Sequence, residues 1–202
     1  MNMIGPQSKF AILAVLFCTV AATPALAMDP VCVQMRSASS ALRTKPFHMY
    51  MTATESFSRP NMAKAASSIG MGGTKQSEEI STGKSIYVMT RGKWIDMQTS
   101  FADMENEKDG DPDTKKALES SKCKALPDEA VFGQSASVYF ESTPGLGIET
   151  KLWVSKSTHL PLKTDITNDQ GTMKTVSSSR YEYSNVQAPS GAISMKDMVK
   201  QH

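Results

Sequence analysis

The chain has 202 residues, of which 22 are Lys or Arg and 20 are Asp or Glu, so its formal net charge is +2 at pH 7. These charges are spread along the sequence, and the lack of a basic stripe argues against a nucleic-acid-binding protein. Hydrophobic residues make up 40% of the chain, which is enough for one domain with a substantial core.

Residues 1–27 predict a cleaved secretory signal. Lys9 precedes an apolar run from Phe10 to Ala22, which is far shorter than the roughly 20 residues that a bilayer span needs. Ala25-Leu26-Ala27 has the small-x-small pattern that signal peptidase cleaves. We therefore expect one mature domain, residues 28–202, that is periplasmic or secreted and has no membrane span.

The mature chain is expected to begin with a helix that ends by Pro46. Asp29 suits the capping position and Pro30 the first turn. Apolar residues then recur at helical spacing, at Val31, Met35, Ala38 and Leu42.

Short strands are predicted after this helix, because apolar and polar residues alternate and turn residues intervene. Their ranges are 47–52, 75–81, 85–90 and 93–99. In the last of them Ile95 and Met97 alternate with Trp94 and Asp96. Residues 59–73, with Pro60 and three glycines, are predicted to form a loop.

The segment from Ser100 to Leu126 is polar and rich in charged residues. Asp111-Pro112 predicts the start of a second helix that reaches about Lys122. Such a helix either covers the edge of a cavity or is a solvated connector, and the sequence leaves both interpretations open.

Alternation returns from Val131 onward and continues through several strands. Ala136, Val138 and Phe140 alternate with polar or amphipathic residues, and strands follow over 148–155 and 160–166. The turn at 168–171 has the composition Asn-Asp-Gln-Gly, and a last strand runs to Tyr183.

This C-terminal half resembles a known superfamily. It is similar to the periplasmic lipoprotein-carrier (LolA/LolB-like) proteins in the order of its features. These are Trp153-Val154, Leu160-Pro161, an alternating strand, a polar turn and then Tyr181-x-Tyr183-x-x-Val186. The resemblance covers residues 128–189 by motif and 29–127 in architecture. It implies an α+β fold, in which a curved antiparallel sheet forms an incomplete barrel covered by a few helices, with a cavity for acyl chains between them.

Two cysteines, Cys32 and Cys123, remain in the mature chain. An oxidising compartment favours a disulfide between them. The alternative is two separately buried thiols that pack like small apolar residues.

Catalytic and metal sites are not predicted. His48, His159 and His202 have no nucleophile beside them, and residues 133–137 lack the second glycine of a nucleophile elbow. Residues 109–120 begin like a calcium loop but lack its glycine at position 6 and its glutamate at position 12. We therefore expect no enzymatic activity, no cofactor and no metal.

The chain is rich in methionine, with 14 residues. Met49 and Met51 share one face of a strand and His48 the other, which disfavours copper ligation and favours an adaptable apolar surface. The predicted ligand surface consists of apolar residues that alternate inward along the strands. These are Met49, Met51, Val88, Met97, Val138, Phe140, Leu152, Val154, Leu162 and Ile166.

The expected function is non-enzymatic binding of a lipid or an acylated protein by a monomer, in the handling of lipoproteins or envelope lipids. The alternative is an envelope sensor or interaction module that docks a protein partner on the same fold. A pocket large enough for an acyl chain favours the first function, and a filled core with an exposed apolar edge favours the second.

Overall fold

The computed structural model describes residues 29–68, 72–106, 116 and 119–199, so the predicted signal peptide lies outside the described residues. In chain order the elements are α1 (Pro30–Ser40), the short 3₁₀ helix η1 (Ala41–Arg43), β1 (Phe47–Phe57), α2 (Pro60–Ser68), β2 (Gly73–Ser81), β3 (Ile86–Thr90), β4 (Lys93–Asp96), α3 (Phe101–Asn106), β5 (Lys122–Val131), β6 (Gln134–Thr143), η2 (Pro144–Leu146), β7 (Ile148–Ser155), β8 (Pro161–Asp169), β9 (Met173–Glu182), β10 (Ile193–Ser194) and α5 (Met195–Val199).

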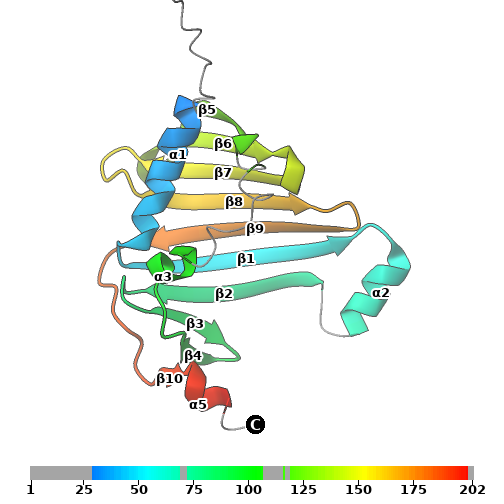
Figure 1. Cartoon of the computed structure of the whole chain (residues 1–202), viewed down its shortest axis with the longest axis vertical. Helices are drawn as coiled ribbons and strands as arrows, with labels where there is room; N and C mark the ends of the chain where they lie inside the picture. The colour runs from blue at the N-terminus through cyan, green and yellow to red at the C-terminus, as the bar shows by residue number, and fades with distance from the viewer. Residues whose placement is uncertain (1–28, 69–71, 107–115, 117–118, 200–202) are drawn as a thin grey trace, which may run out of the picture.

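The described strands form one sheet of ten, in the order β10-β4-β3-β2-β1-β9-β8-β7-β6-β5. Its two ends, β10 and β5, do not pair with each other, so the sheet is not closed into a barrel. Neighbouring strands are antiparallel except β10, which runs parallel to β4. Helix α1 lies across one face of this sheet, and α3 lies on the same side (Figure 1). The predicted α+β fold, an unclosed antiparallel sheet with a few helices, is confirmed.

Helix α1 begins where the sequence predicted. The carboxylate of Asp29 accepts a hydrogen bond from the backbone N–H of Val31 at 2.8 Å, which satisfies a donor in the first turn. The buried side chain of Met35 packs against Leu152 and Val154 of β7. The helix then tightens into η1 before the chain enters β1.

The two faces of the sheet are defined by the β6–β7 register. Tyr139 pairs with Leu152 on the face that carries α1, here called the helix face, whereas Val138 pairs with Trp153 on the opposite face, here called the open face. Apolar side chains are buried on both faces, because Ala136, Val138, Trp153 and Leu162 form a second small core with Leu126 and Val131 of β5. The last residues of β7 are consequently buried without alternation.

Trp153 lies on the open face of β7 and follows the charged residues Glu149 and Lys151 in the alternation along this strand. Its side chain is only 4% exposed. The ammonium groups of Lys151 and Lys163 each lie 4.4 Å from the ring centre, and the indole N–H donates to Glu129 at 2.7 Å. These contacts let a large aromatic ring pack on the open face beneath charged side chains.

Cys32 and Cys123 are bonded, as predicted, with their Cα atoms 5.2 Å apart. The bond joins α1 to β5 at the edge of the sheet. Close to it, Arg36 of α1 forms an ion pair of 2.7 Å with Glu141 of β6. Covalent and ionic contacts therefore fix the helix to the end of the sheet formed by β5, β6 and β7, where Met35 also packs.

Some predicted element types were wrong. Residues 60–68 form α2 rather than a loop, because Pro is compatible with a first helical turn and Met, Lys and Ala favour helix after it. β5 begins at Lys122, where the end of a helix was expected. It is an edge strand, which tolerates charged residues and Pro127, and the register shifts between Leu126 and Glu129.

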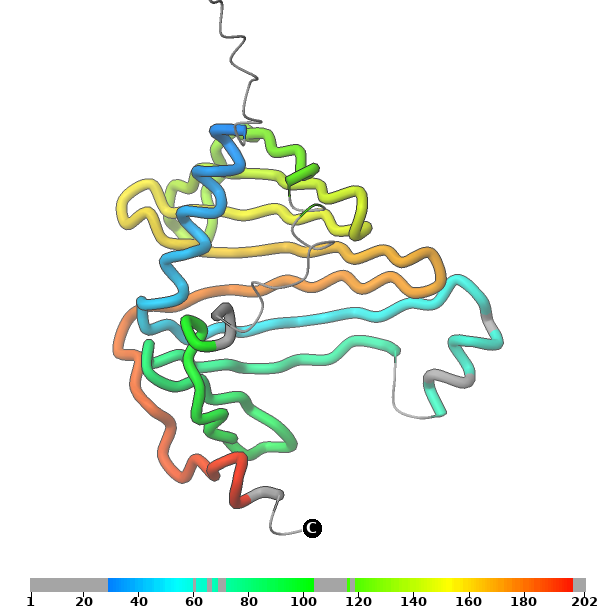
Figure 2. Tube along the Cα trace, in the orientation of Figure 1, coloured from blue at the N-terminus to red at the C-terminus, as the bar shows by residue number. Residues whose placement is uncertain are grey.

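The remaining differences lie at the far edge of the sheet. The C-terminal segment returns to β4, where Ile193 pairs with Ile95, and this return was not predicted (Figure 2). The predicted helix over residues 111–122 falls largely outside the described residues.

The disulfide generates a testable prediction. Cys32→Ser and Cys123→Ser should lower the free energy of unfolding by similar amounts, about 2 to 5 kcal/mol, because each opens the same long covalent loop. Urea unfolding of both variants measures the effect. Alkylation of both thiols of the wild-type protein without prior reduction would contradict the bond.

Candidate ligand pocket

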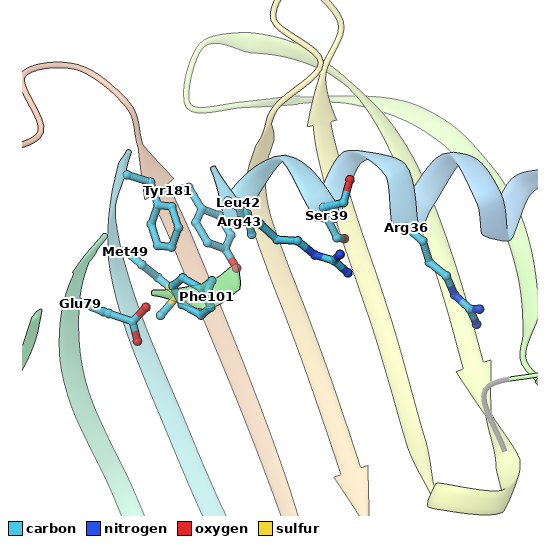
Figure 3. A pocket seen from close by; sticks show the side chains of 10 residues that line it. Arg36, Ser39, Leu42, Arg43, Met49, Glu79, Phe101 and Tyr181 are labelled. Carbon is cyan, nitrogen blue, oxygen red and sulfur yellow. The ribbon is translucent and has the colours of Figure 1, made fainter. Parts of the chain in front are cut away.

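A pocket of about 390 Å³ lies on the helix face, between α1, η1, α3 and strands β1, β2 and β9 (Figure 3). Its volume falls in the range of small-molecule sites. The residues that line it are Arg36, Ser39, Ser40, Leu42, Arg43, Phe47, Met49, Glu79, Phe101 and Tyr181.

The walls of the pocket are mainly apolar and aromatic. The ring of Phe47, 1% exposed, lies 5.7 Å from the ring of Phe101 and 5.7 Å, edge to face, from that of Tyr181. Met49 follows on the same face of β1 and pairs with Tyr181 of β9. Period-two geometry thus brings residues from distant segments onto one apolar surface.

Glu79 is the acidic residue in this surface. It lies on β2, paired with Met49 on one side and Val88 on the other. Its Oε1 atom is buried and has no hydrogen-bond partner among the described residues. Burial raises the pKa of the Glu79 carboxyl above its ordinary value. Burial also raises the pKa of the nearby Tyr181 phenol, and the negative charge of Glu79 raises this pKa further.

Basic and hydroxyl groups come from α1 and η1. Arg36, Ser39 and Arg43 follow one another along this segment, whereas Glu79, Met49 and Phe101 gather at the other end of the view (Figure 3). The pocket therefore has guanidinium groups on its helical side, a carboxyl on its sheet side and apolar walls between them. This arrangement suits an amphiphile better than a fully polar ligand.

The predicted ligand residues do not share one face. Met49 lines the pocket, and Met51, Val88, Leu152, Val154 and Ile166 pair through the strands on the same helix face. Leu152 and Val154 are covered by Met35 of α1 and lie in the core rather than the pocket. The backbone N–H of Met97 bonds to the carbonyl of Ile86, just beyond the end of β4.

Val138, Phe140 and Leu162 belong to the open face, which corrects the expectation of a common inward surface. Val138 and Phe140 pair with Trp153 and Lys151, not with Leu152. A register shift between β7 and β8 turns Leu162 toward Val138 and Trp153. Alternation within each strand was predicted, but the register between strands was not.

Most of the pocket was missed by sequence reasoning. Leu42 belonged to the predicted apolar stripe of the first helix, and Arg36 and Arg43 had no assigned role. Glu79 lies in a predicted strand, where an acidic residue gave no signal that it faces inward. Phe101 lies in the polar segment from Ser100 to Leu126, where a cavity cover and a solvated connector were both left open and no apolar wall was predicted.

Two further hollows lie on the open face on either side of Phe132, which is 55% exposed in the β5–β6 turn. The Arg180 guanidinium lies 5.6 Å from the Phe132 ring and 4.8 Å from the Tyr50 ring. Charged and polar groups make up a larger share of the walls of these hollows than of the pocket under α1, so the pocket under α1 is the better candidate for an apolar ligand.

No family model and no curated protein matches the chain. Among solved structures, LprF from Mycobacterium bovis is 13% identical over 81% of this chain and 97% of its own, with a TM-score of 0.41. A putative outer membrane lipoprotein-sorting protein domain from Vibrio parahaemolyticus is 8% identical over 84% and 96%, with a TM-score of 0.30. MucB, crystallised in complex with MucA(peri), is 13% identical with a TM-score of 0.42, and the match covers 80% of this chain but only 57% of MucB.

At these identities and TM-scores the likeness carries no conclusion about the function of this chain. Among the described residues, no helix is both long and apolar enough to cross a membrane.

The environment of Glu79 predicts a pH-dependent stability. A carboxyl whose folded-state pKa is raised favours the folded protein below its ordinary pKa, and this contribution is lost as pH rises through the folded-state value. Glu79→Gln removes the titration, so the stability of this variant relative to wild type should increase between pH 4 and pH 7. Urea unfolding at both pH values measures it.

Glu149→Gln, at an exposed position of β7, is the matched control. Tyr181 also lines the pocket, and its phenol stays neutral over this range because its pKa is raised above the ordinary value. An equal pH dependence in the Glu79→Gln and Glu149→Gln variants would contradict the assignment of the effect to the pocket.

Proposed function

We propose that this protein is a non-enzymatic, extracytoplasmic binder of a lipid or another amphiphile with an acyl chain. The observation that carries the proposal is the apolar pocket of about 390 Å³ between α1, α3 and the sheet. The compartment is supported by the disulfide, since such bonds persist in oxidising environments, and by the signal sequence that residues 1–27 predict.

The driving force is the transfer of methylene groups from water to the walls formed by Leu42, Phe47, Met49 and Phe101. Each buried methylene contributes roughly 0.8 kcal/mol. The guanidinium groups on the helical side are suited to an anionic or phosphate-bearing headgroup. Because the pocket is open to solvent on that side, a headgroup can stay hydrated while the chain is buried.

Docking of a protein partner is the second candidate, and one observation favours it. The β5–β6 turn presents Phe132 over Arg180 on the open face, outside the pocket. Exposed aromatic and Arg side chains are enriched at protein interfaces. This function uses a different surface, so the two candidates are separable by mutation.

A matched pair of variants on α1 tests lipid binding. Ser39 and Ser37 are both exposed on α1, but Ser39 lines the pocket and Ser37 does not. Ser39→Trp should fill the pocket and weaken binding of the fluorescent probe N-phenyl-1-naphthylamine at least about tenfold, equivalent to about 1.4 kcal/mol. Ser37→Trp should bind as wild type does. Fluorescence titration measures all three proteins.

Failure of the folded wild-type protein to bind the probe at micromolar concentration would contradict the lipid proposal. Equal binding by the two Trp variants would place the probe elsewhere on the protein. In that case, weaker probe binding by Phe132→Ala, which alters the open face alone, would show that the probe adsorbs at that surface.

A further inference from the structure

The carboxyl group of Glu79 is an unusual component of an apolar pocket. Its Oε1 atom is buried without a hydrogen-bond partner among the described residues. The positions opposite Glu79 on the two neighbouring strands are Met49 and Val88, neither of which has a polar side chain. Burying an unpaired polar atom is unfavourable, so native proteins satisfy nearly all such groups or use them for function.

The surrounding elements show which groups face this carboxyl. From α3 and β1 the pocket receives Phe101, Phe47 and Met49, which carry no hydrogen-bond donor in their side chains. From β9 it receives the Tyr181 phenol. The basic groups, Arg36 and Arg43, come from α1 and η1, and Arg36 pairs with Glu141 at 2.7 Å.

We propose, building on the lipid-binding function above, that Glu79 selects amphiphiles that carry a hydrogen-bond donor, a hydroxyl or an amine, on the part that enters the pocket. The donor hydrogen-bonds to the Glu79 carboxyl, which rotates about its terminal bond to present the oxygen that the protein leaves unpaired. A plain hydrocarbon leaves this atom unpaired, and a carboxylate placed beside it repels the ionised form. A site with a buried hydrogen-bonding group discriminates strongly against ligands that lack the matching group.

The pKa of Glu79 agrees with this role. Burial raises it, so the carboxyl is less charged in the empty pocket than an exposed glutamate at the same pH. An ammonium group placed next to the carboxyl favours its ionised form and lowers the same pKa. At a pH at which Glu79 is partly protonated in the empty pocket, binding of an amine should therefore release a proton. Binding of an alcohol should release none.

Displacement of N-phenyl-1-naphthylamine by three ligands of equal chain length tests the inference. 12-Aminododecanoic acid and 12-hydroxydodecanoic acid, whose carboxylate suits the guanidinium side and whose donor lies at the end that enters the pocket, should displace the probe from the wild-type protein at concentrations about tenfold lower than dodecanoic acid does. In Glu79→Met, which keeps a side chain of similar length without the acceptor, this preference should disappear. Glu79→Gln, which keeps an amide oxygen, should retain the preference for the alcohol and lose that for the amine.

The outcomes separate this inference from the proposed function. If all three ligands displace the probe and their order of potency is the same in wild type and Glu79→Met, the role of Glu79 is overturned and lipid binding stays in place. Displacement by none of them, with the probe bound, would overturn lipid binding in this pocket. If Glu79→Met does not fold, the contrast between amine and alcohol in Glu79→Gln decides, and an unchanged preference for the amine overturns the inference.

Discussion

The packing of α1 on the sheet is the contact on which the pocket depends. Met35 inserts against Leu152 and Val154, and the Cys32–Cys123 bond holds the start of the helix to the edge of the sheet. These contacts lie near the first half of α1. The last residues of α1 and η1 extend beyond the core contacts of Met35 and Ala38 toward β9 and β1, where they cover a pocket (Figure 3). One end of the helix is thus structural and the other forms the proposed site.

The two faces of the sheet differ in what covers them. On the open face, Trp153 lies between Lys151 and Lys163, and Arg180 lies over Tyr50, so long charged side chains cover aromatic rings. Such pairs keep a partly apolar surface compatible with water. On the helix face, the strands at the β5 end are covered by α1, whereas β1, β2 and β9 contribute apolar residues to the pocket. A ligand that enters there meets a preformed surface, which reduces the ordering cost of binding.

Much of the fold could be predicted from the sequence because its signals are local. Asp29-Pro30 marks the start of α1, and alternation of apolar and polar residues in the sequence marks β6, β7 and β8. Pairing of the two mature cysteines followed from the expected compartment. By contrast, β5 was missed because an edge strand need not alternate, and α2 because Pro60 and the nearby glycines resembled a loop.

The site was less predictable because it depends on register between segments far apart in the chain. Glu79 faces inward only because it pairs with Met49, and a shift of one residue in that pairing would place it on the open face. The same reason separates Val138 from Leu152, which alternation alone had grouped. A local irregularity between β7 and β8 decides the position of Leu162, and no feature of one sequence reveals it.

The most direct test of the account is native mass spectrometry of the exported protein, purified without detergent from a cell that makes its own envelope lipids. We expect a population that carries one amphiphile, and we expect the same adduct to be absent from the Ser39→Trp variant, whose pocket is filled. A wild-type protein that carries no adduct and takes up none from added lipid would contradict the account. So would an adduct retained equally by the Ser39→Trp variant.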